Sequence, residues 1–213
     1  MRATLPAALI LSAALALTAC AAGEKTTPLP ADEPPPAAGM TDGATEDDAV
    51  EVTRAELKDA EGASRGTVTI EDVDDGRLAV VVEASGLTPG FHAVHLHTIG
   101  KCEPNSADPK DATKKGDFLS SGGHLGEGDH PDHAADLPPL LALKDGTASL
   151  RVVTDRVDSD TLLDDDGSAF VVHEKPDNFA NIPERYASGG ADAETKKAGD
   201  AGPRVVCGAF LPE

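Results

Sequence analysis

Histidines are concentrated in one part of this 213-residue chain. All seven lie between His92 and His173, and neither the first ninety residues nor the last forty contain one. Imidazole is a preferred nitrogen donor for copper and zinc, so this clustering favours a multi-histidine metal site. His95 and His97 are two positions apart. Because side chains on a strand alternate between its faces, both should point the same way, as two ligands of one ion require.

A second group of donors follows at His124, His130, His133 and Asp136. The last three recur with two residues between neighbours, a spacing that brings donors together around a turn in many zinc sites. Three nitrogens and one carboxylate suit a four-coordinate zinc ion, although an acidic, solvated loop with chance histidines is the alternative. Asp129 or Asp132 could also replace one of the histidines as a ligand.

His92 lies three positions before His95, which places it on the opposite face of an unbroken strand. We expect it either to orient a ligand by hydrogen bonding or to pack as an ordinary core histidine.

The remaining pattern predicts an all-β domain. Short runs of β-type residues recur between turns rich in Gly, Pro and Asp, and no long amphipathic helix is evident. Hairpin turns are expected at 74–76 and 144–146, where glycine supplies a positive φ. The pattern indicates an antiparallel sandwich or barrel. The predicted strands cover residues 50–57, 64–70, 78–84, 92–98, 148–154, 169–173 and 205–210.

Two irregular stretches, 100–139 and 174–203, are longer than ordinary loops. The first carries three of the seven histidines and the second leads into Arg204. Loops of this length in a compact domain are usually functional or disordered, and we interpret both as functional.

The N-terminus has the features of an export signal. Arg2 precedes an apolar run at 7–19 that ends in Leu17-Thr-Ala-Cys20. The run is too short to span about 30 Å of hydrocarbon and has the length of a secretory signal. Leu-Thr-Ala-Cys resembles a bacterial lipobox, which implies cleavage before Cys20 and lipidation of its thiol; an ordinary signal peptide with a chance cysteine is the alternative.

The sequence therefore predicts a lipoprotein signal peptide at 1–19, a disordered tether rich in Pro, Ala and acidic residues at 20–48, and one domain at 49–213. The protein would be exported and held on the cell membrane by its lipid, facing the outside of a bacterial cell.

In an oxidising location the two remaining cysteines, Cys102 and Cys207, are expected to form a disulfide, two buried thiols being the alternative. A net charge of −20 excludes nucleic acid as a partner.

Four separated motifs occur in order: Gly86-Leu-Thr-Pro-Gly-Phe-His-Ala-Val-His-Leu-His97, Gly122-Gly-His124, Val171-Val-His-Glu-Lys-Pro-Asp177 and Gly202-Pro-Arg-Val-Val-Cys-Gly208. Together they resemble the copper/zinc superoxide dismutase signature, over roughly residues 50–210. The lipobox and residues 177–186 are most similar to lipoprotein forms of actinobacteria.

The resemblance implies an eight-stranded Greek-key antiparallel β-barrel with two long functional loops. It implies an enzyme that converts superoxide to dioxygen and hydrogen peroxide by alternate reduction and oxidation of a histidine-bound copper, defending the cell surface against external superoxide. The alternative is a non-catalytic copper-buffering lipoprotein on the same fold. An exposed apolar patch would indicate a homodimer, but alternation along such short strands does not locate one.

The resemblance also implies roles for individual residues. Copper would be bound by His95, His97, His124 and His173, and zinc by His124, His130, His133 and Asp136, with His124 shared. Asp177 would hydrogen-bond one ligand of each metal, Arg204 would dock the substrate anion, and Cys102–Cys207 would be the family disulfide. Lys196 and Lys197 resemble a charged guidance loop for the substrate, although ordinary solvated lysines would look the same.

Two features depart from the family pattern. Ala198 stands where the family usually has a threonine opposite the arginine, so the channel should be slightly wider. The zinc loop is shorter than in most relatives, but all four donors are present and we expect one zinc ion beside the copper.

Overall fold

The computed structural model describes residues 49–74 and 76–212. The predicted signal peptide, Cys20 and the tether lie outside these residues. Within the described part of the chain, no helix is long and apolar enough to cross a membrane.

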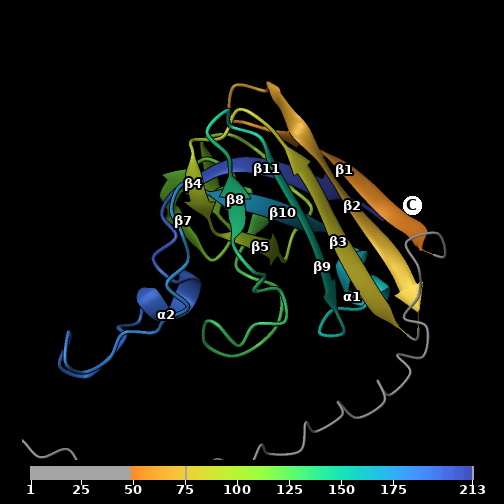
Figure 1. The fold of residues 1–213 in the computed structure, drawn as a ribbon. Coiled ribbons are helices and arrows are strands. Elements are labelled where there is room, and N and C mark those ends of the chain that lie inside the picture. Colours follow the sequence, from red (N-terminus) through yellow and green to blue (C-terminus); the bar gives the residue numbers. More distant parts are fainter. Residues whose placement is uncertain (1–48, 75, 213) are drawn as a thin grey trace, which may run out of the picture. The chain divides into compact units, whose positions relative to one another are not determined.

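Nine strands form one antiparallel sheet in the order β4-β8-β9-β3-β2-β1-β11-β10-β5 (Figure 1). The two edge strands, β4 and β5, are consecutive in the chain and are joined by Ala93 alone. The sheet must therefore curl until its edges approach, which produces a nearly closed barrel. The strands are β1 (Val50–Lys58), β2 (Ser64–Asp74), β3 (Arg77–Ala84), β4 (Gly90–His92), β5 (Val94–His97), β8 (Leu140–Ala142), β9 (Ala148–Thr154), β10 (Ser168–His173) and β11 (Arg204–Phe210).

The strand connections have the crossing pattern of a Greek key. β1, β2 and β3 are neighbours in the sheet and consecutive in the chain. The next strand in the chain, β4, is not the neighbour of β3, because β8 and β9 lie between them in the sheet. If β4 and β5 are counted as one strand interrupted at Ala93, the barrel has the predicted eight strands. The predicted all-β Greek-key fold is confirmed.

The barrel interior is a continuous apolar core. Each strand contributes every second residue, as the alternation of strand side chains requires. Its fully buried members include Leu57, Val68, Ile70, Val80, Leu96, Leu140, Phe170 and Phe210. A smaller cluster of Phe118, Ala169, Val171 and Cys207 lies on the other face of β10, with Cys102 packed against it.

Both faces of β5 and β10 are therefore buried. On β5, Val94 and Leu96 point into the main core, so His95 and His97 occupy the opposite face. This is how a rigid strand presents two imidazoles to the same side.

Three features differ from the sequence prediction. The strand expected at 92–98 is broken at Ala93, so His92 and His95 do not belong to one unbroken strand. The stretch 100–139 contains a hairpin of β6 (Ser106–Asp108) and β7 (Asp111–Gly116) and a 3-10 turn, Leu119–Ser121. The hairpin was missed because its residues are mostly polar and do not alternate.

Short elements account for the other differences. β8, with three residues next to two prolines, and the four-residue helices α1 (Ser159–Leu162) and α2 (Thr195–Ala198) are too short to show a period. The turn predicted at 144–146 is present between β8 and β9, where Gly146 has a φ of 83°.

Candidate metal centre

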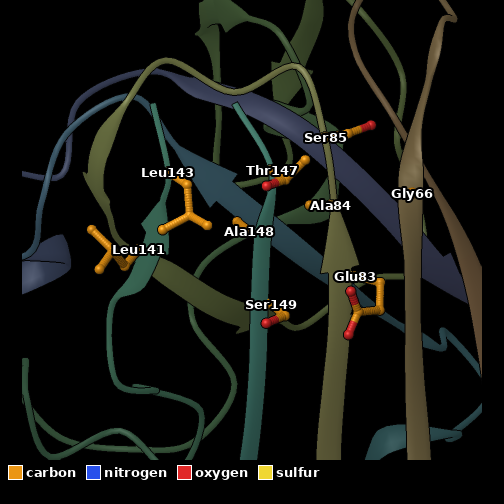
Figure 2. A pocket seen from close by; sticks show the side chains of 9 residues that line it. All are labelled: Gly66, Glu83, Ala84, Ser85, Leu141, Leu143, Thr147, Ala148 and Ser149. Atoms are coloured by element: carbon orange, nitrogen blue, oxygen red, sulfur yellow. The ribbon is translucent and has the colours of Figure 1, made fainter. Parts of the chain in front are cut away.

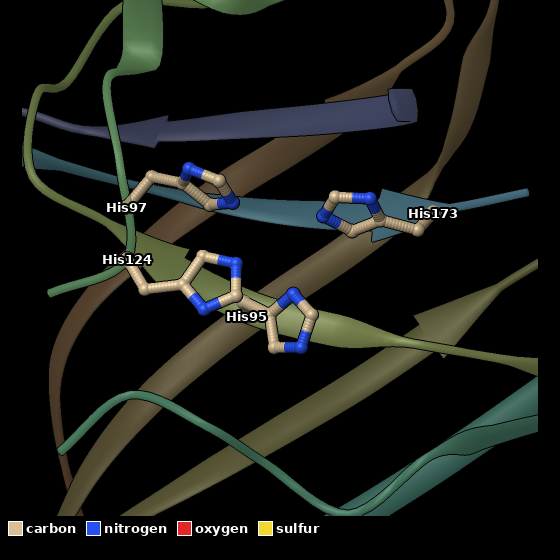
Figure 3. Close-up of side chains that lie close together, drawn as sticks. All are labelled: His95, His97, His124 and His173. Carbon is tan, nitrogen blue, oxygen red and sulfur yellow. The ribbon is translucent and has the colours of Figure 1, made fainter. Parts of the chain in front are cut away.

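Four imidazoles converge on one point beside the barrel. His95 and His97 come from β5, and His173 ends β10, which pairs with β5 so that Val171 faces His95. The ring centroids of His95 and His124 are 3.9 Å apart, and those of His95 and His173 are 4.9 Å apart. Figure 3 shows the four rings turned toward one another. One donor nitrogen from each ring lies within 4.8 Å of all the others.

His124 reaches this group because its segment covers the free edge of β5. Leu125 donates its backbone N–H to Leu96, and Thr98 donates to Gly123. Leu96 in turn donates to Ala135, so residues on both sides of the shortened loop are fastened to β5. The unpaired edge of β5 is thus satisfied by hydrogen bonds to this loop, and these bonds hold the loop's metal donors next to His95 and His97.

The nitrogens of these four rings fit a metal ion. Nδ1 of His97 donates to the carbonyl of Gly122 at 3.0 Å, and Nδ1 of His173 donates to the carbonyl of Gly202 at 3.0 Å. In the same way, Nε2 of His95 and Nδ1 of His124 face carboxylates. The other nitrogen of each ring is buried and has no hydrogen-bond partner among the described residues: Nδ1 of His95 and Nε2 of His97, His124 and His173.

Four buried lone pairs without partners would be costly unless something binds them. Burial lowers the pKa of all four imidazoles, that of His124 to about 4, so the rings are neutral at pH 7 and ready to act as ligands. A buried set of four nitrogens is suited to copper.

The predicted zinc donors lie beside this group, around the carboxylate of Asp136. Nδ1 of His124 is 2.8 Å from its Oδ1, and Nδ1 of His130 and of His133 are 3.0 and 2.9 Å from its Oδ2. The structure therefore brings all four predicted zinc donors together. The His124 ring stands between the two groups, with Nε2 toward the first and Nδ1 toward the second.

The most compact set of donor atoms around Asp136 is not identical with the predicted zinc ligands. The donor atoms of His95, His124, His130 and Asp136 lie within 4.8 Å of one another, whereas His133 is not part of that compact set. Nδ1 of His133 nevertheless lies 2.9 Å from Oδ2 of Asp136, and both nitrogens of His95 are directed elsewhere. Nε2 of His95 is held by Asp177, and its free Nδ1 belongs to the first group.

Asp177 connects the two groups of imidazoles through one hydrogen bond to each group. Its Oδ2 accepts from Nε2 of His95 at 2.9 Å, and its Oδ1 accepts from Nε2 of His130 at 2.7 Å. Burial opposes ionisation, but the hydrogen bonds from His130 and His95 hold the pKa of this carboxyl well below its usual range. Against the effect of burial, Asp136 and Asp177 together raise the pKa of His130 to about 9.

Gly199 is a residue of this region that the sequence did not single out. Its φ is 56°, and a Cβ there would lie 1.9 Å from Oδ1 of Asp177. Only glycine leaves the carboxylate room to reach His130. A glycine is common directly after a helix, but the helix that ends at Ala198 is too short to be recognised from the sequence, so no local signal identified Gly199.

Arg204 lies at the mouth of the first group. It is the cross-strand partner of His173, and its Nη2 donates at 2.7 Å to the Gly122 carbonyl that also accepts from His97. Burial lowers the pKa of Arg204 to about 10, so the guanidinium remains charged at neutral pH. Besides burial, this charge helps to lower the pKa of His97 and of His173. A fixed cation therefore stands next to the four imidazoles.

The two lysines expected to guide the substrate are exposed on α2 and do not touch the imidazoles. Nζ of Lys197 is 2.6 Å from Glu194, and Nζ of Lys196 is 3.6 Å from Asp129. Their charges are thus partly balanced by neighbouring acids. The backbone carbonyl of Lys196 accepts from the N–H of His130 at 2.7 Å, so α2 also holds the loop of the second group.

His92 is buried in β4 and does not contact any ligand ring through a hydrogen bond. Its Nδ1 is 2.7 Å from the carbonyl oxygen of His173, and its Nε2 is 2.8 Å from that of Thr88. It therefore fixes the backbone of one candidate ligand and does not orient its imidazole.

The predicted disulfide between Cys102 and Cys207 is present, with the two Cα atoms 5.7 Å apart. It joins the stretch 100–139 to β11, close to Phe118 in the smaller apolar cluster. The loop that supplies His124 and the strand that carries Arg204 are thereby tied together.

A separate depression of about 500 Å³ lies outside the barrel, over β3, β8 and β9 (Figure 2). It is lined mainly by small side chains and two leucines, and none of the seven histidines contributes to it. It is not part of the metal centre.

Comparisons with known proteins agree with this geometry. The family model described as copper/zinc superoxide dismutase (SODC) matches residues 64–210. A superoxide dismutase (Cu-Zn) from Mycolicibacterium paratuberculosis is 37% identical over 222 residues, covering 96% of this chain and 96% of the relative. One from Mycobacterium tuberculosis is 41% identical over 184 residues, covering 83% of this chain and 72% of the relative.

Solved structures show the same fold. The Cu/Zn superoxide dismutase from Brucella abortus superposes with a TM-score of 0.57 at 28% identity, covering 74% of this chain and 97% of that chain. A SOD-like protein from Bacillus subtilis gives a TM-score of 0.57 at 26% identity, covering 76% of this chain and 100% of that one.

Proposed function

This chain belongs to the copper/zinc superoxide dismutase family, and on that premise we propose which of its residues perform each part of the reaction. It is an enzyme that converts superoxide to dioxygen and hydrogen peroxide with copper and zinc as cofactors. We assign copper to His95, His97, His124 and His173, and zinc to His124, His130, His133 and Asp136. The observation that carries the copper assignment is the set of four buried ring nitrogens without partners.

Bound copper would supply the electron transfer, accepting an electron from one superoxide and giving it to a second, which leaves as hydrogen peroxide with two protons. The residues of the chain supply the binding site and the protons. Arg204 attracts the anion to the copper side of the site because its guanidinium stays charged there. This is how an acidic protein can take an anionic substrate.

His124 is the residue best placed to handle a proton. Its Nδ1 is held on the side of Asp136, whereas its Nε2 faces the copper group and has no protein partner. A proton on Nε2, carried when that nitrogen is not bound to copper, would therefore be delivered where the product forms. Asp177 keeps His95 and His130 in the orientation that both metals need.

The docking role of Arg204 is tested by the Arg204→Ala variant of the full chain, loaded with copper and zinc. Superoxide decay, followed by pulse radiolysis, should slow at least about tenfold at equal copper content, because a steering charge raises on-rates by about 10–10³. Arg204→Lys should fall between the two. Equal rates in the wild type and Arg204→Ala would refute the docking role of Arg204.

We also retain the proposal that the protein is exported and lipidated on Cys20. It is supported by the lipobox-like Leu17-Thr-Ala-Cys20 and by the disulfide, which persists mainly outside the cytosol. Mass spectrometry of the membrane fraction should detect the lipid on Cys20, and a Cys20→Ala variant should move to the soluble fraction. A wild-type protein that is unlipidated in its native cell would overturn this proposal.

A homodimer is proposed through an apolar patch on β4 and β8. Phe91, Leu141 and Leu143 are 56%, 46% and 55% exposed. Phe91 and Leu141 are cross-strand partners, and Leu143 lies two positions further, on the same side as Leu141 (Figure 2). Sedimentation analysis should show a dimer that Leu141→Asp converts to a monomer. A wild type that is monomeric at 100-fold dilution and at high concentration alike would refute it.

A further inference from the structure

Ser121 has a contact that sets it apart from the other residues around Arg204. It is 0% exposed and is the last residue of the 3-10 turn Leu119–Ser121. Its hydroxyl donates to the carbonyl of Phe118 at 2.9 Å, so its only proton is used. Its oxygen is then free to accept, and Nη1 of Arg204 donates to it at 2.9 Å.

This contact completes the hydrogen bonding of one nitrogen of the guanidinium. Nη1 has two protons, and they go to the carbonyl of Phe118 at 2.7 Å and to Ser121. Nη2 donates one proton to the carbonyl of Gly122 at 2.7 Å. A guanidinium has five N–H groups, so three are engaged by the protein.

The two remaining N–H groups are one on Nη2 and the one on Nε. Among the described residues neither makes a hydrogen bond, and in a planar guanidinium the Nε–H and one N–H of Nη2 lie along the same edge. A pair of parallel N–H groups is the arrangement that binds an oxyanion most strongly. The three protein contacts therefore decide in which direction this edge faces.

We propose that Ser121 is a positioning residue for anion binding: its buried hydroxyl fixes the plane of the Arg204 guanidinium so that the Nε–Nη2 edge stays presented to the anion. The inference rests on the proposed docking role of Arg204. The two carbonyl contacts alone leave the second proton of Nη1 without a partner. The guanidinium would then tilt to satisfy that proton elsewhere, since a buried unpaired donor is costly.

The adjacent Ser120 offers a matched control. It is also buried in the same turn, but its hydroxyl donates to the carbonyl of Lys101 at 3.4 Å and accepts from the N–H of Glu103 at 3.2 Å. It makes no contact with Arg204 among its hydrogen bonds. Ser120→Ala therefore removes a buried hydroxyl from the same turn without touching the arginine.

The test measures azide binding to the copper-loaded full chain, from the azide-to-copper absorption band, in the wild type and in Ser121→Ala, Ser121→Thr, Ser120→Ala and Arg204→Ala. Azide is an anion, so its affinity reports on the docking edge without turnover. Ser121→Ala should raise the azide dissociation constant about three- to tenfold, which is the worth of one hydrogen bond. Ser121→Thr, which keeps the hydroxyl, and Ser120→Ala should stay within about twofold of the wild type.

Two outcomes separate this inference from the proposal on which it rests. If Arg204→Ala weakens azide binding but Ser121→Ala behaves like Ser120→Ala, the positioning role of Ser121 is wrong and the docking role of Arg204 stands. If Arg204→Ala leaves azide binding unchanged, the docking role itself fails. Copper content and melting temperature, measured for each variant, separate a lost contact from a lost fold. If Ser121→Ala does not fold, Ser121→Cys, which replaces the hydroxyl by a weakly accepting thiol, takes its place and should also weaken azide binding.

Discussion

Replacing Asp177 by asparagine should weaken zinc binding far more than copper binding. The Oδ2 atom of the carboxylate accepts from His95 at 2.9 Å, and its Oδ1 accepts from His130 at 2.7 Å and from the backbone N–H of Phe179 at 2.6 Å. Asparagine has the same shape but one acceptor oxygen, and its nitrogen can only donate. Only one of the two rings can therefore keep an acceptor. Whichever way the amide turns, both contacts lose the negative charge, and charge-assisted bonds are about twice as strong as neutral ones.

The two rings differ in what else holds them. His95 belongs to β5, which pairs with β10 on one side and with the segments around His124 and Asp136 on the other. His130 lies in a stretch without strands, held by Asp177, by its N–H bond to Lys196 and by its neighbours around Asp136. Weakening of both contacts should thus disturb the orientation of His130 much more than that of His95.

The expected change in zinc affinity can be calculated from the hydrogen bond that is weakened. A group that orients a metal ligand is typically worth about 10–100-fold in metal affinity, which is about 1.4–2.8 kcal/mol. A hydrogen bond to a charged group is worth about 1.5–3 kcal/mol, so the two values agree. We expect the zinc dissociation constant to rise about 10–100-fold and that of copper by less than about tenfold.

The assay is a competition between the metal-free protein and a chromophoric chelator at pH 7, done separately with zinc and with copper. Asp200→Asn is the control, because Asp200 is an exposed neighbouring carboxylate that accepts from Asn178 and Thr195 and from no imidazole. A zinc dissociation constant in Asp177→Asn within twofold of that in Asp200→Asn would refute the reasoning.

Three further changes have expected results. Replacing Cys102 and Cys207 together by serine opens a link between residues 105 apart and should lower the free energy of unfolding by up to about 4.7 kcal/mol in urea. Leu57→Ala removes a fully buried core side chain and should cost about 2–5 kcal/mol in the same measurement, with metal content unchanged. Arg156→Ala removes the 2.6 Å bond from Nη2 to the carbonyl of Asp132 and should raise the zinc dissociation constant about two- to tenfold.

Each of these has a control and a contradicting result. Leu141→Ala, at an exposed position, should cost less than about 0.5 kcal/mol; a cost similar to that of Leu57→Ala would contradict the core assignment. Arg54→Ala removes an exposed arginine that pairs with Glu51, and zinc binding equal to that of Arg156→Ala would show that Arg156 does not hold the loop. Equal urea midpoints for the serine double variant and the wild type would disprove the contribution of the disulfide.

Much of the candidate site was predictable because its donors belong to short, distinctive motifs. The spacing of His95 and His97 indicated a shared face, and the strand β5 provides it. The family resemblance singled out His124, His173 and Asp177, which the structure brings close together, and the disulfide, which is present. The predictions that were wrong depend on short or polar elements: the unbroken strand through His92 and the absence of structure in 100–139.

The sequence by itself determined the fold class, the family, and the types and order of the donors, because alternation along strands and motif spacing are local properties of the chain. The tertiary structure alone decided which nitrogen of each imidazole stays free, since that depends on carbonyls such as those of Gly122 and Gly202 that lie on other segments. It also decided that Lys196 and Lys197 face acids, and that Ser121 meets Arg204, 83 residues further along the chain. These contacts form only when the curled sheet brings distant segments together, and no local pattern encodes them.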